Sequence, residues 1–236
     1  MPITRLHRGP RTAAQAGRAM VCAALAIEAE TVTRHFEREA WGPGFADLSE
    51  FIGQAAADGC RGIVSYGVSG GLVPALRSGD IVVGSEIIGP SGSIPTDDLW
   101  SAWLLSALPT AVFGPVAGVE LPIAALAKRS ELHLRSGALA ADMESHLIAR
   151  LATANSMRFV ALRVIIDAAG RNIPPTALAC ISPDGATSRW RVSRLLLGRP
   201  WDALDMIRLS ADWWLARRAL LHCSEVLGAS VHAIEL

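Results

Sequence analysis

Several acidic residues lie in contexts where a carboxylate can do chemistry. They share a position beside or at the end of an apolar stretch: Glu28, Glu30, Asp142, Glu144 and Asp167. An ionised carboxylate can activate water or hold hydroxyl groups, and a protonated one can donate a proton. Each also has a plainer structural interpretation, as a first-turn residue, a helix cap or a turn former. The chemistry therefore depends on whether the fold brings these acids together.

The elements expected around these acids alternate in the manner of an α/β protein. Short apolar runs predict buried strands at Val21–Ile27, Gly62–Tyr66, Ile81–Val83, Ala111–Val116 and Phe159–Ile166. Helices are predicted at Thr31–Glu39, Phe51–Asp58 and Asp142–Ala154. Ligands of such sheets lie beyond the carboxyl ends of strands, and Glu30, the glycine loop Gly67–Gly71 and Asp167 all fall there. Burial at a strand end would also raise the pKa of Asp167 and keep a proton available.

The remaining segments are expected to lie outside the central sheet. Gly89–Asp98 collects Gly, Pro and Ser, which predicts a mobile surface loop. Residues 1–19 contain several Arg without an apolar core, so we expect a flexible extension and not a signal peptide. Residues 20–236 are expected to form a single domain with a helical C-terminal extension over about 176–236. Within it, Ala203–Leu221 predicts an amphipathic helix with this apolar set: Leu204, Ile207, Ala211, Trp214 and Leu215.

Composition excludes several classes of partner. Apolar residues make up 51% of the chain, enough for a substantial core, and no stretch reaches the roughly 18 apolar residues that a membrane span needs. Basic and acidic residues balance at 22 each, so no net field attracts nucleic acid. The cysteines lack zinc-ligand spacing and are interpreted as buried thiols of a cytoplasmic protein: Cys22, Cys60, Cys180 and Cys223. We expect no metal and no nucleic acid.

Four motifs in sequence order resemble those of the nucleoside phosphorylase and nucleosidase superfamily. Tyr66–Leu72 and Pro74–Val83 are similar to the glycine loop and following strand of methylthioadenosine/S-adenosylhomocysteine nucleosidases and purine phosphorylases. The remaining motifs are Ala26–Glu30, Asp142–Glu144 and Arg163–Asp167. The resemblance covers about residues 21–175. It implies a three-layer α/β/α fold with a central mixed sheet, of the phosphorylase/hydrolase kind, with the C-terminal helical extension added.

The resemblance also implies cleavage of the bond between a purine and a ribose. That reaction needs a base that leaves protonated, a nucleophile at the anomeric carbon and a stabilised oxocarbenium-like sugar. Asp167 matches the acid that protonates purine N7, and Glu30 matches the acid that activates the nucleophilic water. Met143 and Glu144 match the ribose-binding pair.

Other residues implied by the resemblance would bind substrate without reacting. Ser69, Gly70 and Gly71 belong to the loop that lines the sugar and nucleophile site. The purine-binding segment is expected near Val119–Ile123, which includes Leu121, although no firm motif marks it.

The motifs depart from the superfamily pattern at two places. Ile166 stands where the nucleosidases usually have Ser, so the hydrogen bond that orients the acid or the base must come from elsewhere. Ser65 and Val68 stand where bacterial purine phosphorylases carry a phosphate-binding Arg and Ser. Because a phosphate dianion needs such donors, the sequence favours water as nucleophile. Phosphate stays open as a co-substrate, and no other cofactor is expected.

The C-terminal region resembles hopanoid-biosynthesis-associated phosphorylases. The similar segments are Ala177–Ser182, Trp190–Pro200 and the helix around Trp213–Trp214. This implies a lipid-linked adenine nucleoside, adenosylhopane, as substrate, in a cytoplasmic homodimer or higher oligomer that contacts the inner face of the membrane. Alternatively, Trp213–Trp214 packs on the chain's own sheet or on a partner subunit.

Two other functions stay open at the level of sequence. One is salvage of methylthioadenosine, S-adenosylhomocysteine or another small adenine nucleoside. The other is a non-catalytic purine-binding module, against which the retention of Glu30, Glu144 and Asp167 argues.

Overall fold

Eight strands of the described residues form one mixed sheet. The computed structural model describes residues 19–24, 26–32, 39–40, 45–167 and 203–229. The strands are β1 (Ala19–Cys22), β2 (Glu39–Ala40), β3 (Gly62–Gly71), β4 (Ile81–Gly89), β5 (Gly92–Pro95), β6 (Val112–Gly118), β7 (Ala140–Asp142) and β8 (Arg158–Asp167). Their order is β2-β1-β3-β7-β6-β4-β5, and β8 pairs with both β3 and β4. The β3–β8 pair is parallel and the β4–β8 pair is antiparallel.

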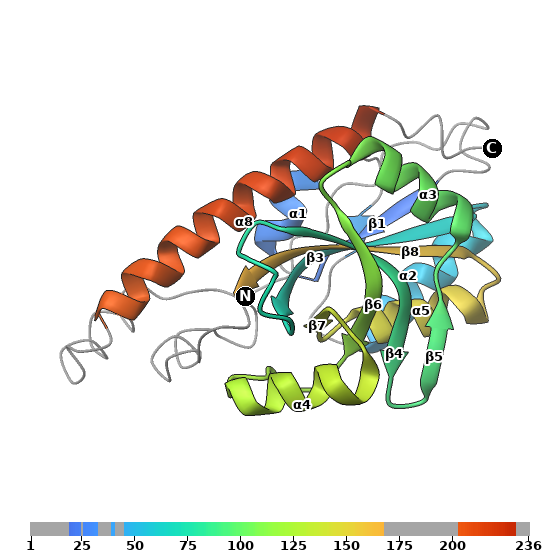
Figure 1. Ribbon diagram of the computed structural model, residues 1–236. Coiled ribbons are helices and arrows are strands. Elements are labelled where there is room, and N and C mark those ends of the chain that lie inside the picture. Colours follow the sequence, from blue (N-terminus) through green and yellow to red (C-terminus); the bar gives the residue numbers. More distant parts are fainter. Residues whose placement is uncertain (1–18, 25, 33–38, 41–44, 168–202, 230–236) are drawn as a thin grey trace.

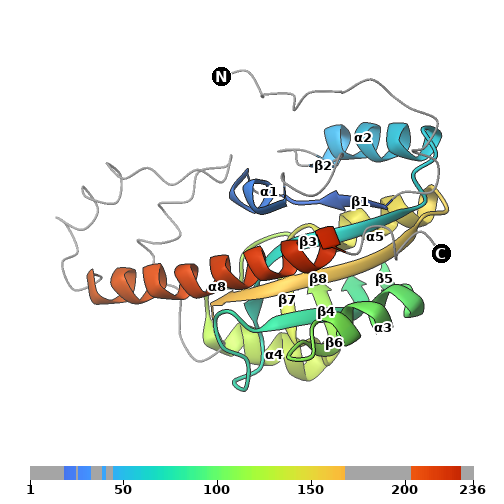
Figure 2. The same cartoon turned by 90° about the horizontal axis from the view of Figure 1, so that it is seen from above.

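Helices cover both faces of this sheet (Figures 1 and 2). The helices are α1 (Ala26–Val32), α2 (Phe45–Ala57), α3 (Asp98–Ala107), α4 (Leu126–Ser136), α5 (Ser145–Ala154) and α8 (Ala203–Ala229). The core cluster on one face contains residues of α2 and α5, and the cluster on the other contains residues of α3 and α8. The expected three-layer α/β/α fold with a mixed sheet is confirmed.

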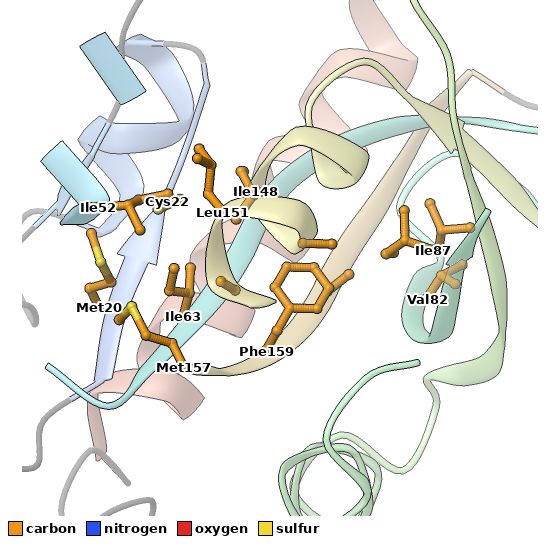
Figure 3. Close-up of a cluster of buried hydrophobic side chains, with 14 of the residues drawn as sticks. Met20, Cys22, Ile52, Ile63, Val82, Ile87, Ile148, Leu151, Met157 and Phe159 are labelled. Carbon is orange, nitrogen blue, oxygen red and sulfur yellow. The ribbon is translucent and has the colours of Figure 1, made fainter. Parts of the chain in front are cut away.

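Strand β8 shows how the sequence assigns side chains to the two faces. Phe159 and Ile165 pack on the α2/α5 face, and Val160 and Val164 pack on the α3/α8 face. Figure 3 shows Phe159 in the first of these clusters, which also contains Ile148 of α5. Because side chains of a strand alternate between its faces, the α2/α5 face also receives the charged residue in the middle of β8. This face carries the site.

The N-terminal region differs from the sequence-based prediction. Strand β1 ends at Cys22 and a helix begins at Ala26, whereas a strand was expected to continue through Ile27. Of the helix expected over Thr31–Glu39, only its first two residues are helical, residues 33–38 lie outside the described residues, and Glu39 belongs to β2. The expected extension over residues 1–19 also lies outside the description, except that Ala19 begins β1. Helix α2 is confirmed and begins earlier than expected.

Two segments expected to be loops are paired strands. Residues 67–71 form the end of β3, where the backbone pairs with β8 and β7. Gly89–Asp98 is a hairpin of β4 and β5 that leads into α3, with Asp97 as the helix N-cap. Gly92 has a φ of 115° at the hairpin turn, a conformation that favours glycine. The Gly, Pro and Ser content therefore marked a turn and a short edge strand and not an irregular loop.

In the part of α8 whose side chains are described, a different face is buried from the one predicted; the side chains of Leu204 and Ile207 lie outside the description. The buried apolar residues follow helical spacing: Ala216, Leu220, Cys223 and Leu227. Trp214 and Leu215, expected on the apolar face, are 59% and 44% exposed. The helix thus packs on the sheet of its own chain through its C-terminal half. The expected lipid-related segments at Ala177–Ser182 and Trp190–Pro200 lie outside the described residues.

Two further expectations can be compared with the described residues. Cys22, Cys60 and Cys223 are buried free thiols, as expected, and Cys180 lies outside the description. Among the described helices, none has both the length and the apolar character needed to cross a bilayer.

Candidate active site

The carboxyl ends of β3 and β8 lie side by side and set the spacing of the site. Arg163 pairs with Gly67 in the register, whereas Asp167 pairs with Gly70. The register shifts between Ser69 and Gly70, so β8 has one residue more than β3 at this point, as in a β-bulge. Such a bulge re-aims a side chain at the end of a strand. As a result Arg163 and Asp167, four residues apart on β8, lie opposite Gly67 and Gly70, which are three residues or roughly 10 Å apart on β3.

Arg163 is the centre of a buried polar cluster. Its side chain is 1% exposed, and its Nη2 donates to Ser65 Oγ at 2.5 Å and to Ser145 Oγ at 2.7 Å. Its Nε lies 2.7 Å from Asp142 Oδ2, and that carboxylate is equally buried. A buried charge is tolerated only with such pairing. The guanidinium is therefore fixed in position by β3, β7 and α5 together.

Asp142 is the last residue of β7, so the helix predicted over Asp142–Ala154 begins later than expected, at Ser145. Asp142 Oδ1 accepts from the backbone N–H groups of Glu144 at 3.0 Å and Ser145 at 2.7 Å. This arrangement turns the chain so that Glu144 lies beside the cluster and Met143 is 37% exposed. Burial raises the pKa of Glu144 to about 7, with Asp142 adding to the rise and Arg163 opposing it. Glu144 is not a solvated first-turn residue, and at neutral pH it exists in both charge states.

Glu28 is the acid that helix α1 brings to this cluster. It is 2% exposed, and its Oε1 accepts from the backbone N–H of Val68 at 2.8 Å. A Cβ atom added to Gly67 would lie 2.6 Å from Glu28 Oε1 and 2.7 Å from Arg163 Nη1. The acid and the guanidinium therefore converge on Gly67, and only glycine leaves room for both.

The structure does not bring Glu30 to the same place. Its side chain is exposed on α1, while that of Glu28 is buried. Residues two apart on a helix face different directions, so only one of the two acids can point at the strand ends. The assignment of Glu30 as the water-activating acid stays a prediction.

Asp167 forms a second acidic centre over Gly70. A Cβ atom on Gly70 would lie 3.2 Å from Asp167 Oδ1, and Oδ2 forms an ion pair with Arg129 Nη2. Burial raises the pKa of Asp167 to about 6, and the charge and hydrogen bond of Arg129 oppose that rise. A carboxyl with this pKa is partly protonated near neutral pH, which suits a general acid. The predicted desolvation of Asp167 is therefore present.

The remaining predicted binding residues are divided between buried and exposed positions. Ser69 is 3% exposed, and within the described part of the chain its buried Oγ has no hydrogen-bond partner. An unpaired buried hydroxyl costs about 1–3 kcal/mol, which a bound ligand would recover. The Gly71 carbonyl accepts from Arg129 Nη1 at 3.5 Å. Leu121 is 75% exposed, so within this chain its side chain does not line a closed purine pocket.

Sequence reasoning gave no specific role to three residues of this site. Arg163 had a signal, since it is the one charged residue inside an apolar strand run. Glu28 was among the candidate acids, but the superfamily motif gave the water-activating role to Glu30. Arg129 had no signal, because an arginine on a polar helix is normally exposed. No three His, Cys, Asp or Glu side chains among the described residues are grouped to hold a metal ion.

The sequence of this chain matches a known protein family. The model of the phosphorylase superfamily matches residues 3–179, which include all of the strands described above. The chain belongs to the phosphorylase superfamily. It is accordingly an enzyme of the class that cleaves N-glycosyl bonds of nucleosides. Among curated proteins, no sequence matches the chain significantly.

Solved structures show the same superfamily fold. A 5'-methylthioadenosine/S-adenosyl homocysteine nucleosidase of Campylobacter jejuni is 17% identical with a TM-score of 0.58, over 66% of this chain and 88% of that chain. The native futalosine hydrolase of Helicobacter pylori is 15% identical with a TM-score of 0.57, over 64% and 88%. A nucleosidase mutant of Helicobacter pylori with 5'-methylthioadenosine in its active site is 13% identical with a TM-score of 0.65, over 92% and 99%. At these identities the likeness concerns the fold.

Proposed function

We propose that this member of the phosphorylase superfamily hydrolyses the N-ribosidic bond of an adenine nucleoside, and that its substrate is adenosylhopane. The observation that carries the reaction is the pair of centres on β3 and β8. One is the acid–guanidinium cluster at Gly67, and the other is the partly protonated carboxyl of Asp167 at Gly70. A nucleoside lying between them would meet a nucleophile site at its sugar and a proton donor at its base.

In the proposed reaction Asp167 gives its proton to purine N7 as the C1'–N9 bond breaks. The bonding electrons leave with the base, and the sugar becomes oxocarbenium-like. Glu144, beside the cluster, accepts hydrogen bonds from the ribose hydroxyls, and Ser69 supplies a further hydroxyl. A water held at Glu28 and Arg163 attacks C1' and gives its proton to Glu28. The products are adenine and a ribose that still carries the 5' substituent, here the hopane. Glu28 then loses its proton to solvent, and Asp167 regains one from solvent.

The charge of the Gly67 cluster favours water over phosphate. Its ionisable groups are three acids and one arginine: Glu28, Asp142, Glu144 and Arg163. Arg163 is already paired with Asp142 and bonded to two serines. A phosphate dianion would therefore face excess negative charge, whereas a neutral water can donate to a carboxylate. This supports hydrolysis, with phosphorolysis as the alternative that the experiment below distinguishes.

The proposal of a lipid-linked substrate is supported by the exposed part of α8. Trp214 is 59% exposed, and the Arg218 guanidinium lies 5.9 Å from the centre of its ring. An exposed Trp beside an Arg suits the boundary between a membrane and water. We therefore propose that the enzyme collects its substrate at the inner face of the membrane. A cytoplasmic location and a homo-oligomer are proposed from the superfamily resemblance alone.

A second candidate is salvage of a small adenine nucleoside. One solved structure that matches 92% of this chain has 5'-methylthioadenosine in its active site. Nothing in the Gly67 and Gly70 centres distinguishes the two substrates, because both carry the same base and sugar. The difference lies at the 5' substituent alone.

The test is the release of free adenine from adenosylhopane and from 5'-methylthioadenosine, each with and without phosphate. We expect turnover of adenosylhopane without phosphate and a loss of about 10²–10⁴-fold in Asp167→Asn, the usual contribution of a general acid. Glu50→Gln, at an exposed acid on α2, serves as the control and keeps wild-type activity. Faster turnover of 5'-methylthioadenosine would refute the lipid-linked substrate and support salvage of a small adenine nucleoside. A strict phosphate requirement would refute hydrolysis, and no release from either would indicate a binding module.

A further inference from the structure

Arg129 is a buried arginine on a largely exposed helix. Helix α4 is largely polar, and Arg129 is its buried residue, with 2% exposure. Burying a guanidinium is costly unless its donors are satisfied. Here they are directed at three separate segments of the chain. Nε donates to the Ile123 carbonyl at 2.8 Å, Nη1 lies 3.5 Å from the Gly71 carbonyl, and Nη2 pairs with Asp167 Oδ2.

These contacts distinguish the two oxygens of Asp167. Oδ2 is paired with Arg129, whereas Oδ1 is the oxygen nearer to Gly70, where an added Cβ would lie 3.2 Å from Oδ1 and 3.6 Å from Oδ2. The neighbouring Ile166 packs toward the α3/α8 core and contributes no polar group to the acid. The orienting hydrogen bond that the sequence required from elsewhere is thus supplied by α4.

We propose that Arg129 is a positioning residue that fixes Asp167 so that Oδ1 carries the proton to the base. This inference rests on the proposed function. Because the same guanidinium holds the Ile123 carbonyl, it ties the segment after β6 to the proton donor and to the glycine-rich end of β3. Arg129 acts through Asp167 and through this segment, without contact with the reacting atoms.

Arg129 also sets the pH range in which Asp167 holds its proton. Among the described residues, the charged groups that act on Asp167 are Arg129 on α4 and Asp212 on α8. Burial and Asp212 raise the pKa of Asp167, and Arg129 opposes them. Removing the guanidinium would therefore leave the acid protonated to higher pH. A paired arginine typically lowers a carboxyl pKa by about 1–3 units, which sets the size of the expected shift.

The test compares Arg129→Met, Arg129→Lys and Arg135→Met in the full chain. Arg135 is an exposed arginine on the same helix and is the matched control. In the pH dependence of adenine release, we expect the alkaline limb of Arg129→Met to move up by about one unit or more, with kcat lowered about tenfold. Arg129→Lys keeps the charge, so its limb stays near that of wild type while kcat falls, since an ammonium cannot reach all three acceptors. Arg135→Met behaves as wild type.

A second readout separates this inference from the proposed function. Carbon-13 NMR titration of the Asp167 carboxyl, without substrate, is expected to show a higher pKa in Arg129→Met than in wild type and Arg135→Met. This holds even if the wild-type enzyme releases no adenine, a result that would refute only the proposed function. An unchanged pKa, or an Arg129→Lys enzyme with wild-type kcat and pH profile, would overturn the role of Arg129. If Arg129→Met does not fold, Arg129→Gln replaces it and is judged by the same outcomes.

Discussion

Arg163 Nε lies 2.7 Å from Asp142 Oδ2, and both side chains are 1% exposed. The pair joins β8 to the end of β7, just before α5, so one interaction both ties these elements together and orients the cluster at Gly67. Breaking a buried pair by removing one partner leaves an uncompensated charge in the core. Structure and proposed chemistry therefore depend on the same two residues.

Replacing Asp142 with Asn is expected to lower the free energy of unfolding by about 3–5 kcal/mol, the usual cost of an unpaired buried charge. Urea denaturation measures this value. The double variant Asp142→Asn/Arg163→Met should lose less than the sum of the two single variants. As a control, Arg158 is 43% exposed and lies 3.8 Å from Asp97, so Arg158→Met should cost less than about 1 kcal/mol. Additive losses in the double variant would show that the pair is not coupled.

Replacing Gly67 with Ala is expected to abolish most activity, because its Cβ would collide with both Glu28 and Arg163. A displacement near 1 Å at such a site can cost about 100-fold in rate. Gly53→Ala on α2 is the matched control, since a Cβ there meets nothing within 4 Å. Steady-state kinetics of adenine release compares the two. Near-normal activity in Gly67→Ala would rule out a close approach of the two side chains in the working enzyme.

Replacing each of the two acids of α1 in turn identifies which one activates water. Glu28→Gln is expected to lower kcat by about 10²–10⁴-fold, the usual range for a general base, because Glu28 is the acid that faces Gly67. Glu30→Gln, at the exposed position, should retain most activity. The same kinetic assay distinguishes them. The opposite ranking would restore the assignment of Glu30 that the superfamily motif implied.

Replacing Glu144 with Gln is expected to change how stability depends on pH. The folded-state pKa of Glu144, about 7, lies above its ordinary value of 4.5, so folding favours the protonated form. That stabilisation is complete below about pH 4.5 and is lost as the pH rises through 7. Glu144→Gln should therefore be more stable than wild type at pH 8, by on the order of 1–3 kcal/mol, and similar to it at pH 4.5.

Thermal melting at both pH values tests this expectation for Glu144. Glu50→Gln, at an exposed acid of α2, should follow the wild-type curve at each pH. Equal melting temperatures of Glu144→Gln and wild type at pH 8 would mean that Glu144 is not buried in its charged form. A gain in stability together with a loss of activity would show that the acid is retained for function at a cost to the fold.

The fold was predictable from sequence because its strongest signals are apolar runs and their order. The apolar run that ends before Asp167 predicted a strand with an acid at its end and one charged residue, Arg163, inside it. Backbone pairing was less predictable. Residues 67–71 read as a loop because glycines are common in loops, but their pairing partners lie about 70 and 95 positions further along the chain. Local composition cannot predict hydrogen bonds between segments so far apart in the sequence.

The candidate site could be predicted only where each segment was correctly assigned as helix or strand. Had the chain stayed extended through residue 30, Glu28 and Glu30 would share one face, since side chains repeat every two residues in a strand. The helix that begins at Ala26 separates them instead. Arg129 could not be found by periodicity, because its burial comes from contacts with Ile123, Gly71 and Asp167 that only the tertiary fold creates. Arg163, by contrast, could be noticed because it interrupts an apolar run.

The strand that carries Arg163 and Asp167 is paired on both edges in its central part. β8 is hydrogen-bonded to β3 on one side and, around residues 162–164, to β4 on the other. The amide protons of these residues should therefore exchange with solvent only through the rarest openings of the domain. In such an arrangement local fluctuations cannot release the catalytic strand, so heat should inactivate the enzyme at the same temperature at which the whole domain melts.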